Sequence, residues 1–152
     1  MSPEPALDKP AALRRSALFE LLSRVELDVL ADLSKPRRFA AGQEIFREGD
    51  LGDSLFVLVE GEVEVQRAAP GPATLAVLGA PAAFGEMSLV DREQRSATVR
   101  ARSAVLALQL TAENFTTFRK HSRDGFTLVV MNIARLLSSR LRETSAKLAA
   151  KR

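Results

Sequence analysis

Cysteine, tryptophan and tyrosine are missing from this chain of 152 residues, and histidine occurs once, at His121. The lack of cysteine excludes disulfides, thiolate metal sites and cysteine nucleophiles, and it fits a protein of the cytoplasm. The single histidine stands in a basic run without the partners that acid–base catalysis needs, and no Walker loop or HExxH motif is present. We therefore expect neither an enzyme nor a metal site.

Long hydrophobic runs are also missing. No apolar stretch approaches the roughly 18 residues that cross a bilayer, and the first ten residues lack the basic-then-apolar order of a secretory signal. Apolar residues make up 46% and charged residues 27%, which is the balance of a soluble globular protein without a membrane partner. At this length we expect about one domain with a hydrophobic core of its own.

Positive charge is concentrated at the C-terminal end, although the net charge of the chain is only +3. From Arg119 to Arg152, nine lysines or arginines stand against two acids, so this end carries +7 and the first 118 residues carry −4. Such a tail can attract nucleic acid or an anionic surface, but it is also the pattern of a solvated helix face. Because no tyrosine or tryptophan is there to stack on bases, we expect no direct binding of nucleic acid.

Hydrophobic periodicity divides the chain into three parts that follow a loose, proline-containing arm over residues 1–10. Residues 11–35 show the spacing of two short amphipathic helices. Residues 36–110 change to short β-type runs separated by glycine turns, and residues 111–152 return to helical spacing with Thr111 as the N-cap. The predicted fold class is α+β: an antiparallel β-roll or jelly-roll barrel flanked by N-terminal helices and a long C-terminal helix.

The last predicted helix carries an apolar stripe. Its first members are spaced by 4, 3 and 4 residues, and the stripe consists of Phe126, Val130, Ile133, Leu137, Leu141, Thr144 and Leu148. This a/d-like pattern favours a homodimer that forms through the C-terminal helix. The alternative is a helix that packs only on its own barrel.

The segment 84–99, FGEMSLVDREQRSATV, interrupts the predicted strands and carries groups that suit a phosphate and a sugar. Gly85 allows a ligand to approach the backbone closely, where the free amides of a helix start favour an anion. Arg95 precedes a β-type run and can pair with phosphate oxygens, and Ser96 adds a hydroxyl donor. Glu86 can accept hydrogen bonds from sugar hydroxyls. Alternatively, Glu86 and Arg95 form an ordinary salt bridge, and Gly85 only makes a turn.

This segment closely resembles the phosphate-binding cassette of cyclic nucleotide-binding domains. The family form is Phe-Gly-Glu, two small or apolar residues, Leu, a variable stretch, then Arg, a small residue, Ala, Thr and Val. The runs 42–50 and 52–63 resemble the glycine-bearing turns of the family, and the likeness spans residues 16–150. Gln94 departs from the family, which often has proline there, and this alters loop stiffness more than chemistry. The resemblance implies a cyclic nucleotide-binding domain over residues 11–152.

The resemblance also implies roles for single residues. Glu86 is expected to accept the ribose 2′-hydroxyl, Arg95 to neutralise the cyclic phosphate, and the amides of Gly85 and Glu86 to hold the ligand. The predicted ligand-binding residues of the cassette are Gly85, Glu86, Met87, Ser88, Arg95, Ser96 and Ala97.

A second, shorter likeness lies in the last helix. The run 140–147 is similar to the central helix of the catabolite activator family, in which a Thr-Ser pair contacts adenine across a dimer. By that likeness Thr144 and Ser145 read the base and Arg140 braces Glu86, whereas the alternative is a helix with ordinary surface hydroxyls. The likeness favours cAMP as the ligand, and the hydroxyl of Ser96 is compatible with cGMP.

Together these observations predict a non-enzymatic, stand-alone regulatory sensor that binds cAMP, requires no cofactor and responds through its C-terminal helix. Two alternatives stay open: the sensor part of a longer transcription factor, channel or kinase, and an interaction barrel that binds no ligand. The sequence does not specify a downstream protein partner.

Overall fold

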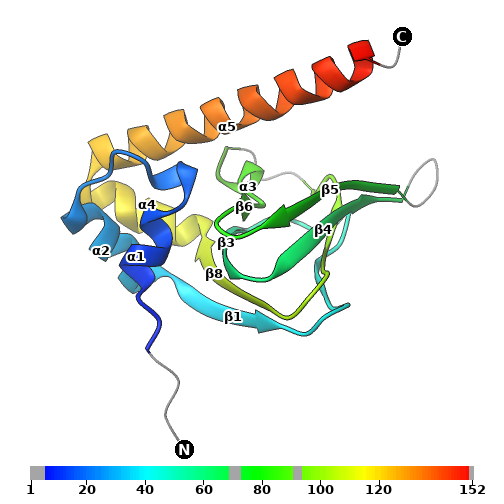
Figure 1. The fold of residues 1–152 in the computed structure, drawn as a ribbon. Coiled ribbons are helices and arrows are strands. Elements are labelled where there is room, and N and C mark those ends of the chain that lie inside the picture. The colour runs from blue at the N-terminus through cyan, green and yellow to red at the C-terminus, as the bar shows by residue number, and fades with distance from the viewer. Residues whose placement is uncertain (1–5, 69–72, 91–93, 151–152) are drawn as a thin grey trace, which may run out of the picture.

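The computed structural model describes residues 6–68, 73–90 and 94–150. It confirms the predicted fold class, because two four-stranded antiparallel sheets form a β-roll with helices packed beside it and a long helix at the C-terminal end (Figure 1). The helices are α1 (Lys9–Arg14), the 3-10 turn η1 (Ala17–Phe19), α2 (Arg24–Leu33), α3 (Met87–Val90), α4 (Ala112–His121) and α5 (Arg123–Ala150).

The N-terminal helices differ from the prediction in where they begin. Helix α1 starts at Lys9, inside the predicted arm 1–10, because the Asp8 side chain caps it and Pro10 stands in its first turn, where proline is tolerated. The predicted pair of helices is a set of three short elements, since Ser16 caps η1 and Ser23 forms a capping box at the start of α2.

The strands form two sheets with the orders β1-β8-β3-β6 and β2-β7-β4-β5. The roll extends one residue beyond the predicted segment 36–110 at each end. Thr111 ends the last strand and, as predicted, caps α4 through a reciprocal pair of hydrogen bonds with Asn114. The strands are β1 (Lys35–Phe39), β2 (Glu44–Phe46), β3 (Ser54–Glu60), β4 (Glu62–Arg67), β5 (Ala73–Gly79), β6 (Ala83–Phe84), β7 (Thr98–Ala101) and β8 (Val105–Thr111).

Two hydrophobic cores meet at strand β3. Leu55 and Val57 face the helices, whereas Phe56 and Leu58 face the second sheet, and none of the four is more than 5% exposed. The alternation of side chains along a strand places successive residues in different cores. The roll is therefore attached to the helices through its central strand and encloses a second core between its own sheets.

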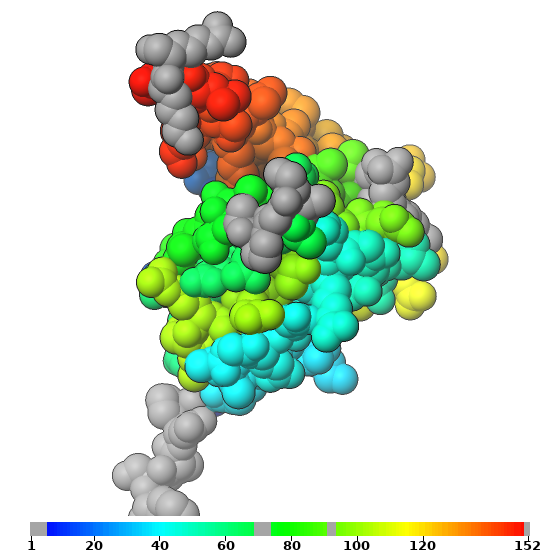
Figure 2. Space-filling view, turned by 90° about the vertical axis from the view of Figure 1, so that its right-hand side faces the viewer, coloured from blue at the N-terminus to red at the C-terminus, as the bar shows by residue number. Residues whose placement is uncertain are grey.

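Helix α5 consists of two halves with different surroundings. In the first half Val129 and Ile133 are buried, and the buried Asn132 donates hydrogen bonds of 3.0 Å to the carbonyls of Leu18 and Glu20. In the second half the predicted apolar stripe is exposed, since the side chains of Leu141 and Leu148 are both largely accessible to solvent. This half runs past the helices, and Figure 2 shows it, orange to red, above the green segment that contains β4 and β5.

The first half of α5 is thus buried against η1 and α4 of its own chain, and whether the exposed distal half packs on a second copy stays a prediction. Among the described residues, no helix is long and apolar enough to cross a membrane.

Candidate ligand-binding site

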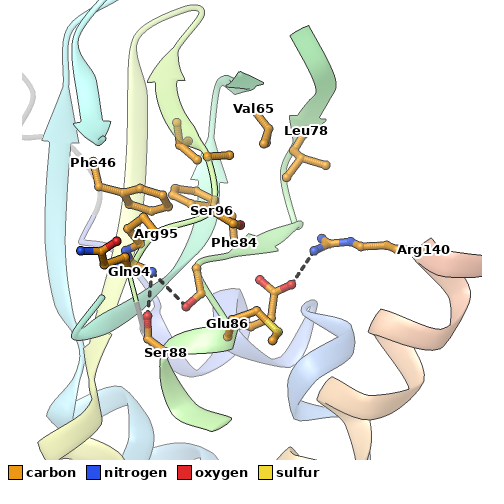
Figure 3. Close-up of a pocket in the computed structure, with 14 residues that line it drawn as sticks. Phe46, Val65, Leu78, Phe84, Glu86, Ser88, Gln94, Arg95, Ser96 and Arg140 are labelled. Carbon is orange, nitrogen blue, oxygen red and sulfur yellow. Dashed lines mark hydrogen bonds and ion pairs between the residues drawn. The ribbon is translucent and has the colours of Figure 1, made fainter. Parts of the chain in front are cut away.

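A cavity of about 270 Å³ opens between the second sheet, the segment from β6 to α3, and α5 (Figure 3). One wall comes from strands of the roll, one from the predicted cassette and one from a single side chain of α5. The lining residues are Phe46, Val65, Leu78, Phe84, Gly85, Glu86, Met87, Ser88, Gln94, Arg95, Ser96, Ala97, Val99 and Arg140.

Arg95 is held against the cavity by neutral groups. Its side chain is nine-tenths buried, and its Nη1 donates to Ser88 Oγ at 2.7 Å and to the Gly85 carbonyl at 3.3 Å. Its Nη2 donates to the Ser54 carbonyl at 2.7 Å. The ring of Phe46 lies under the guanidinium, 3.9 Å from Cζ to the ring centroid, so a cation–π contact fixes one face of the group.

The charge of Arg95 has no direct counter-charge within the described part of the chain. Its Nε is buried without a hydrogen-bond partner, and the salt bridge with Glu86 that the sequence left open does not form. Burial lowers the pKa of Arg95, while the more distant charges of Asp53, Asp50 and Glu86 act in the opposite direction. Arginine nevertheless stays protonated in proteins, so the cavity contains a buried cation whose contacts are neutral. Such a group favours an anion.

Gly85 is required by the geometry beside Arg95. Its φ of +77° lies in the left-handed region, and a Cβ there would stand 2.8 Å from Arg95 Nη1 and 3.1 Å from the Ser54 carbonyl oxygen. Glycine thus allows the backbone to turn from β6 into α3 directly against the guanidinium.

Glu86 forms an ion pair with Arg140 of helix α5. Its carboxylate is almost fully buried, and Arg140 Nη1 donates to Oε1 at 2.6 Å. Arg140 Nη2 also donates to the Ala83 carbonyl at 3.1 Å, so the last helix is joined both to the cassette and to strand β6 just before it. This geometry confirms the prediction that Arg140 braces Glu86.

The remaining wall is apolar and suits a flat ring. Val65 and Val99 are register partners on β4 and β7, and Leu78 comes from the neighbouring strand β5. The ring of Phe84 stacks on Phe56 behind the cavity at a centroid distance of 5.3 Å. The lining positions that the sequence analysis did not assign are Phe46, Val65, Leu78, Phe84, Gln94 and Val99. Alternation along β4 could have placed Val65 on the same face as the buried Val63.

Most of the predicted ligand-binding residues meet at this cavity. Those that line it are Gly85, Glu86, Met87, Ser88, Arg95, Ser96, Ala97 and Arg140. Thr144 and Ser145 do not line it: both are exposed on the distal half of α5, and the Thr144 hydroxyl donates to the Arg140 carbonyl of its own helix. Their assignment as base readers stays a prediction, as do the binding roles of the other residues. Within the described ranges, no group of three or more His, Cys, Asp or Glu side chains is placed to hold a metal.

Comparison with known proteins identifies the family of the domain. Residues 36–122 match the model of the cyclic nucleotide-binding domain. The chain belongs to this family. Members of the family are regulatory domains, and this one has the family's cassette at its cavity, with Arg95 on one side of Gly85 and Glu86 and Arg140 on the other.

Three similar proteins show the range of the family. The Cyclic AMP receptor protein of Thermus thermophilus is 36% identical over 138 residues, which are 90% of this chain and 62% of that protein. A crystal structure of Thermus thermophilus Catabolite Activator Protein superposes with a TM-score of 0.75, also at 36% identity, and covers 88% of this domain and 62% of that chain. A cyclic nucleotide-binding domain from Methylobacillus flagellatus gives a TM-score of 0.83 at 26% identity, with 95% and 82% covered.

A further relative is an enzyme. Glutaminase 1 of Bradyrhizobium diazoefficiens is 36% identical over 135 residues, which are 89% of this chain but 22% of that protein. The shared segment is therefore the domain described here and not the whole glutaminase. The chain spans less than two thirds of the length of both the Thermus receptor protein and the glutaminase.

Proposed function

We propose that this domain is a regulatory sensor for cAMP, with the cyclic phosphate at Arg95 and the ribose at Glu86. The buried guanidinium of Arg95 is the observation that carries the proposal. Its three hydrogen bonds to neutral acceptors use three of the five N–H groups of a guanidinium, which leaves two. A phosphate supplies both the missing negative charge and the oxygens for these donors.

Glu86 is the proposed contact of the ribose. Its Oε1 accepts from Arg140, and a carboxylate has further lone pairs that can accept from a sugar hydroxyl. The apolar wall of Val65, Leu78 and Val99 would then lie against the base. The cavity has the polar-plus-apolar lining that is typical of small-molecule sites.

The preference for cAMP over cGMP rests on the Thermus relative, which is named a Cyclic AMP receptor protein and aligns with 90% of this chain. Ser96, at the edge of the cavity, is the group that would favour cGMP in its place. The proposed output is helix α5, because Arg140 connects it to the cassette. A ligand shifts this helix only as far as it binds one arrangement of the Glu86–Arg140 pair more tightly than another.

We propose that the sensor acts on its own in the cytoplasm. The alternative is the sensor part of a longer regulator, which the length of the Thermus relative supports. The sequence of the full native reading frame decides between the two.

The first test is calorimetric titration of nucleotide-stripped protein with cAMP and cGMP, with 5′-AMP as the non-cyclic control. We expect cAMP to bind more tightly than cGMP, and Arg95→Ala to weaken cAMP binding by about 2–4 kcal/mol, because a charge-assisted contact is lost. Arg102→Ala is the matched control, since Arg102 is half-exposed and pairs at 3.7 Å with Glu64, away from the cavity. Wild-type protein that binds neither cyclic nucleotide would overturn the proposal.

We also propose a homodimer that forms through the distal half of α5. Leu141 is 68% exposed and Leu148 is 61% exposed, and they lie seven residues apart, which is the spacing of equivalent positions in a helix pair. Light scattering after size exclusion should give twice the chain mass for the wild type and the single mass for Leu141→Ser/Leu148→Ser. A monomeric wild type, with and without cAMP, would contradict this proposal.

A further inference from the structure

Gly52 lies next to Ser88 and the guanidinium of Arg95 but does not line the cavity itself. It is buried in the turn before β3, and this turn is attached to the residues around Arg95. Leu51 forms a β-bridge with Gln94, and the Arg95 amide donates to the Asp50 carbonyl at 2.6 Å. The backbone at position 52 is therefore fixed relative to Arg95.

The missing side chain of Gly52 leaves room that two other groups use. A Cβ at this position would stand 2.5 Å from Ser88 Oγ, 3.1 Å from Arg95 Nε and 3.2 Å from Arg95 Cζ. The φ of Gly52 is not in the left-handed region, unlike that of Gly85. Glycine is thus required at position 52 because a side chain would not fit there, and not because of its backbone conformation.

We propose that Gly52 is a positioning residue for Arg95, and that it acts through Ser88. Ser88 is 4% exposed, and its Oγ accepts from Arg95 Nη1 at 2.7 Å. A methyl group at position 52 forces this hydroxyl to turn away and breaks the bond. The guanidinium cannot move aside freely, because the ring of Phe46 lies 3.9 Å from its Cζ. The inference rests on the proposed function, since it assigns the residue that sets the orientation of the proposed phosphate-binding group.

The test is a double-mutant cycle with Gly52→Ala and Ser88→Ala, read by calorimetric titration with cAMP. Each single change is expected to weaken binding about tenfold, because each removes the same hydrogen bond to a charged group. The double variant is expected to bind within about threefold of Ser88→Ala, because the 2.5 Å contact with Ser88 Oγ is then gone and no second bond is lost. The contact of the Cβ with Arg95 Nε at 3.1 Å remains, but a small shift of the guanidinium relieves it. If the double variant binds as well as Ser88→Ala, then the substitution at position 52 does not by itself prevent folding, and weak binding of Gly52→Ala is not explained by misfolding. Gly79→Ala is the matched control, since a Cβ there meets nothing closer than 3.9 Å.

A second measurement does not depend on nucleotide binding. The Nε–H resonance of Arg95 in the nucleotide-free protein is assigned by its loss in Arg95→Lys, and it is expected to shift in Gly52→Ala but not in Gly79→Ala. If wild-type protein binds no cyclic nucleotide, the proposed function fails while this resonance still tests the role of Gly52. Wild-type affinity in Gly52→Ala, additive losses in the double variant, or an unshifted resonance would each overturn the inference.

Discussion

Replacing Arg140 with alanine tests how the last helix is attached to the ligand site. Arg140 is the residue of the distal half of α5 whose side chain forms hydrogen bonds with the roll, within the residues that the structure describes. Arg140→Ala removes the 2.6 Å ion pair with Glu86 and the 3.1 Å bond to the Ala83 carbonyl. It leaves Glu86, whose side chain is 6% exposed, buried without its cation.

The magnitude follows from the uneven burial of the two partners. Breaking a fully buried pair costs about 3–5 kcal/mol, and an exposed pair contributes about 0–1 kcal/mol. Because the Arg140 side chain is 35% exposed, solvent screens the pair and we expect a value between these limits. The free energy of unfolding of nucleotide-free Arg140→Ala should fall by about 1–3 kcal/mol, measured by urea denaturation.

Amide hydrogen exchange gives the local readout. Residues 138–150 should exchange faster in Arg140→Ala, because the distal half of α5 loses its polar contacts with the roll, while the buried first half around Ile133 should be unchanged. Arg142→Ala is the matched control, since Arg142 is exposed two positions further along the same helix. Equal unfolding free energies and equal exchange in Arg140→Ala and wild type would refute the assignment of Arg140 as the attachment of α5.

Three further predictions concern other parts of the domain. Gly85→Ala and Gly42→Ala should each lose about 1–2 kcal/mol of stability in urea, because both positions have left-handed φ. Of these two, only Gly85→Ala should also weaken cAMP binding, since nothing lies within 4 Å of a Cβ at position 42; equal affinities would contradict the geometry at Arg95. The hydrogen bond from Ser122 lowers the pKa of Glu26, so the stability from ionised Glu26 is present at neutral pH and is lost as the pH falls through that lowered value. Glu26→Gln should therefore be less stable than wild type by about 1 kcal/mol at pH 7, and the difference should shrink in acid; a pH-independent difference would argue against it. Asn132→Ala should lose about 1–3 kcal/mol, because two carbonyls lose their donor, and wild-type stability would show that these bonds contribute nothing net.

Local patterns explain why the fold and the centre of the site were predictable. Short β-type runs separated by glycine turns favour a closed antiparallel sheet structure, and the cassette places Gly85, Glu86 and Arg95 within eleven residues of one another. The partner of Glu86 follows from no local pattern, and only the likeness of the run 140–147 to the catabolite activator family pointed to Arg140. Arg95 is nine residues away in sequence, yet it turns to Ser54 and Ser88, and Arg140, 54 residues away, forms the ion pair.

Other features depend on contacts that no local pattern encodes. Asn132 is a polar residue that periodicity assigns to a helix surface, but it is 4% exposed because the loop around η1 offers carbonyl groups at that point. Gly52 looks like a turn glycine in the sequence, and only the packing of Ser88 and Arg95 shows that its lack of a side chain matters. The sequence pattern identified the apolar stripe on the distal half of α5. A dimer contact through that stripe depends on a second copy of the chain, which a pattern within one sequence does not describe.

Strand β3 has a consequence for the unfolded protein. Because it faces a core on both sides and pairs with β8 and β6 at both edges, its sequence is the continuous apolar run Leu55–Val59, with neither a charge nor a proline. Once the domain opens, such a β-prone run associates readily with copies of itself, and Asp53 and Glu60 at its two ends are the charges that oppose this. We therefore expect heating to end in irreversible aggregation, which makes urea the better denaturant for stability comparisons in this domain.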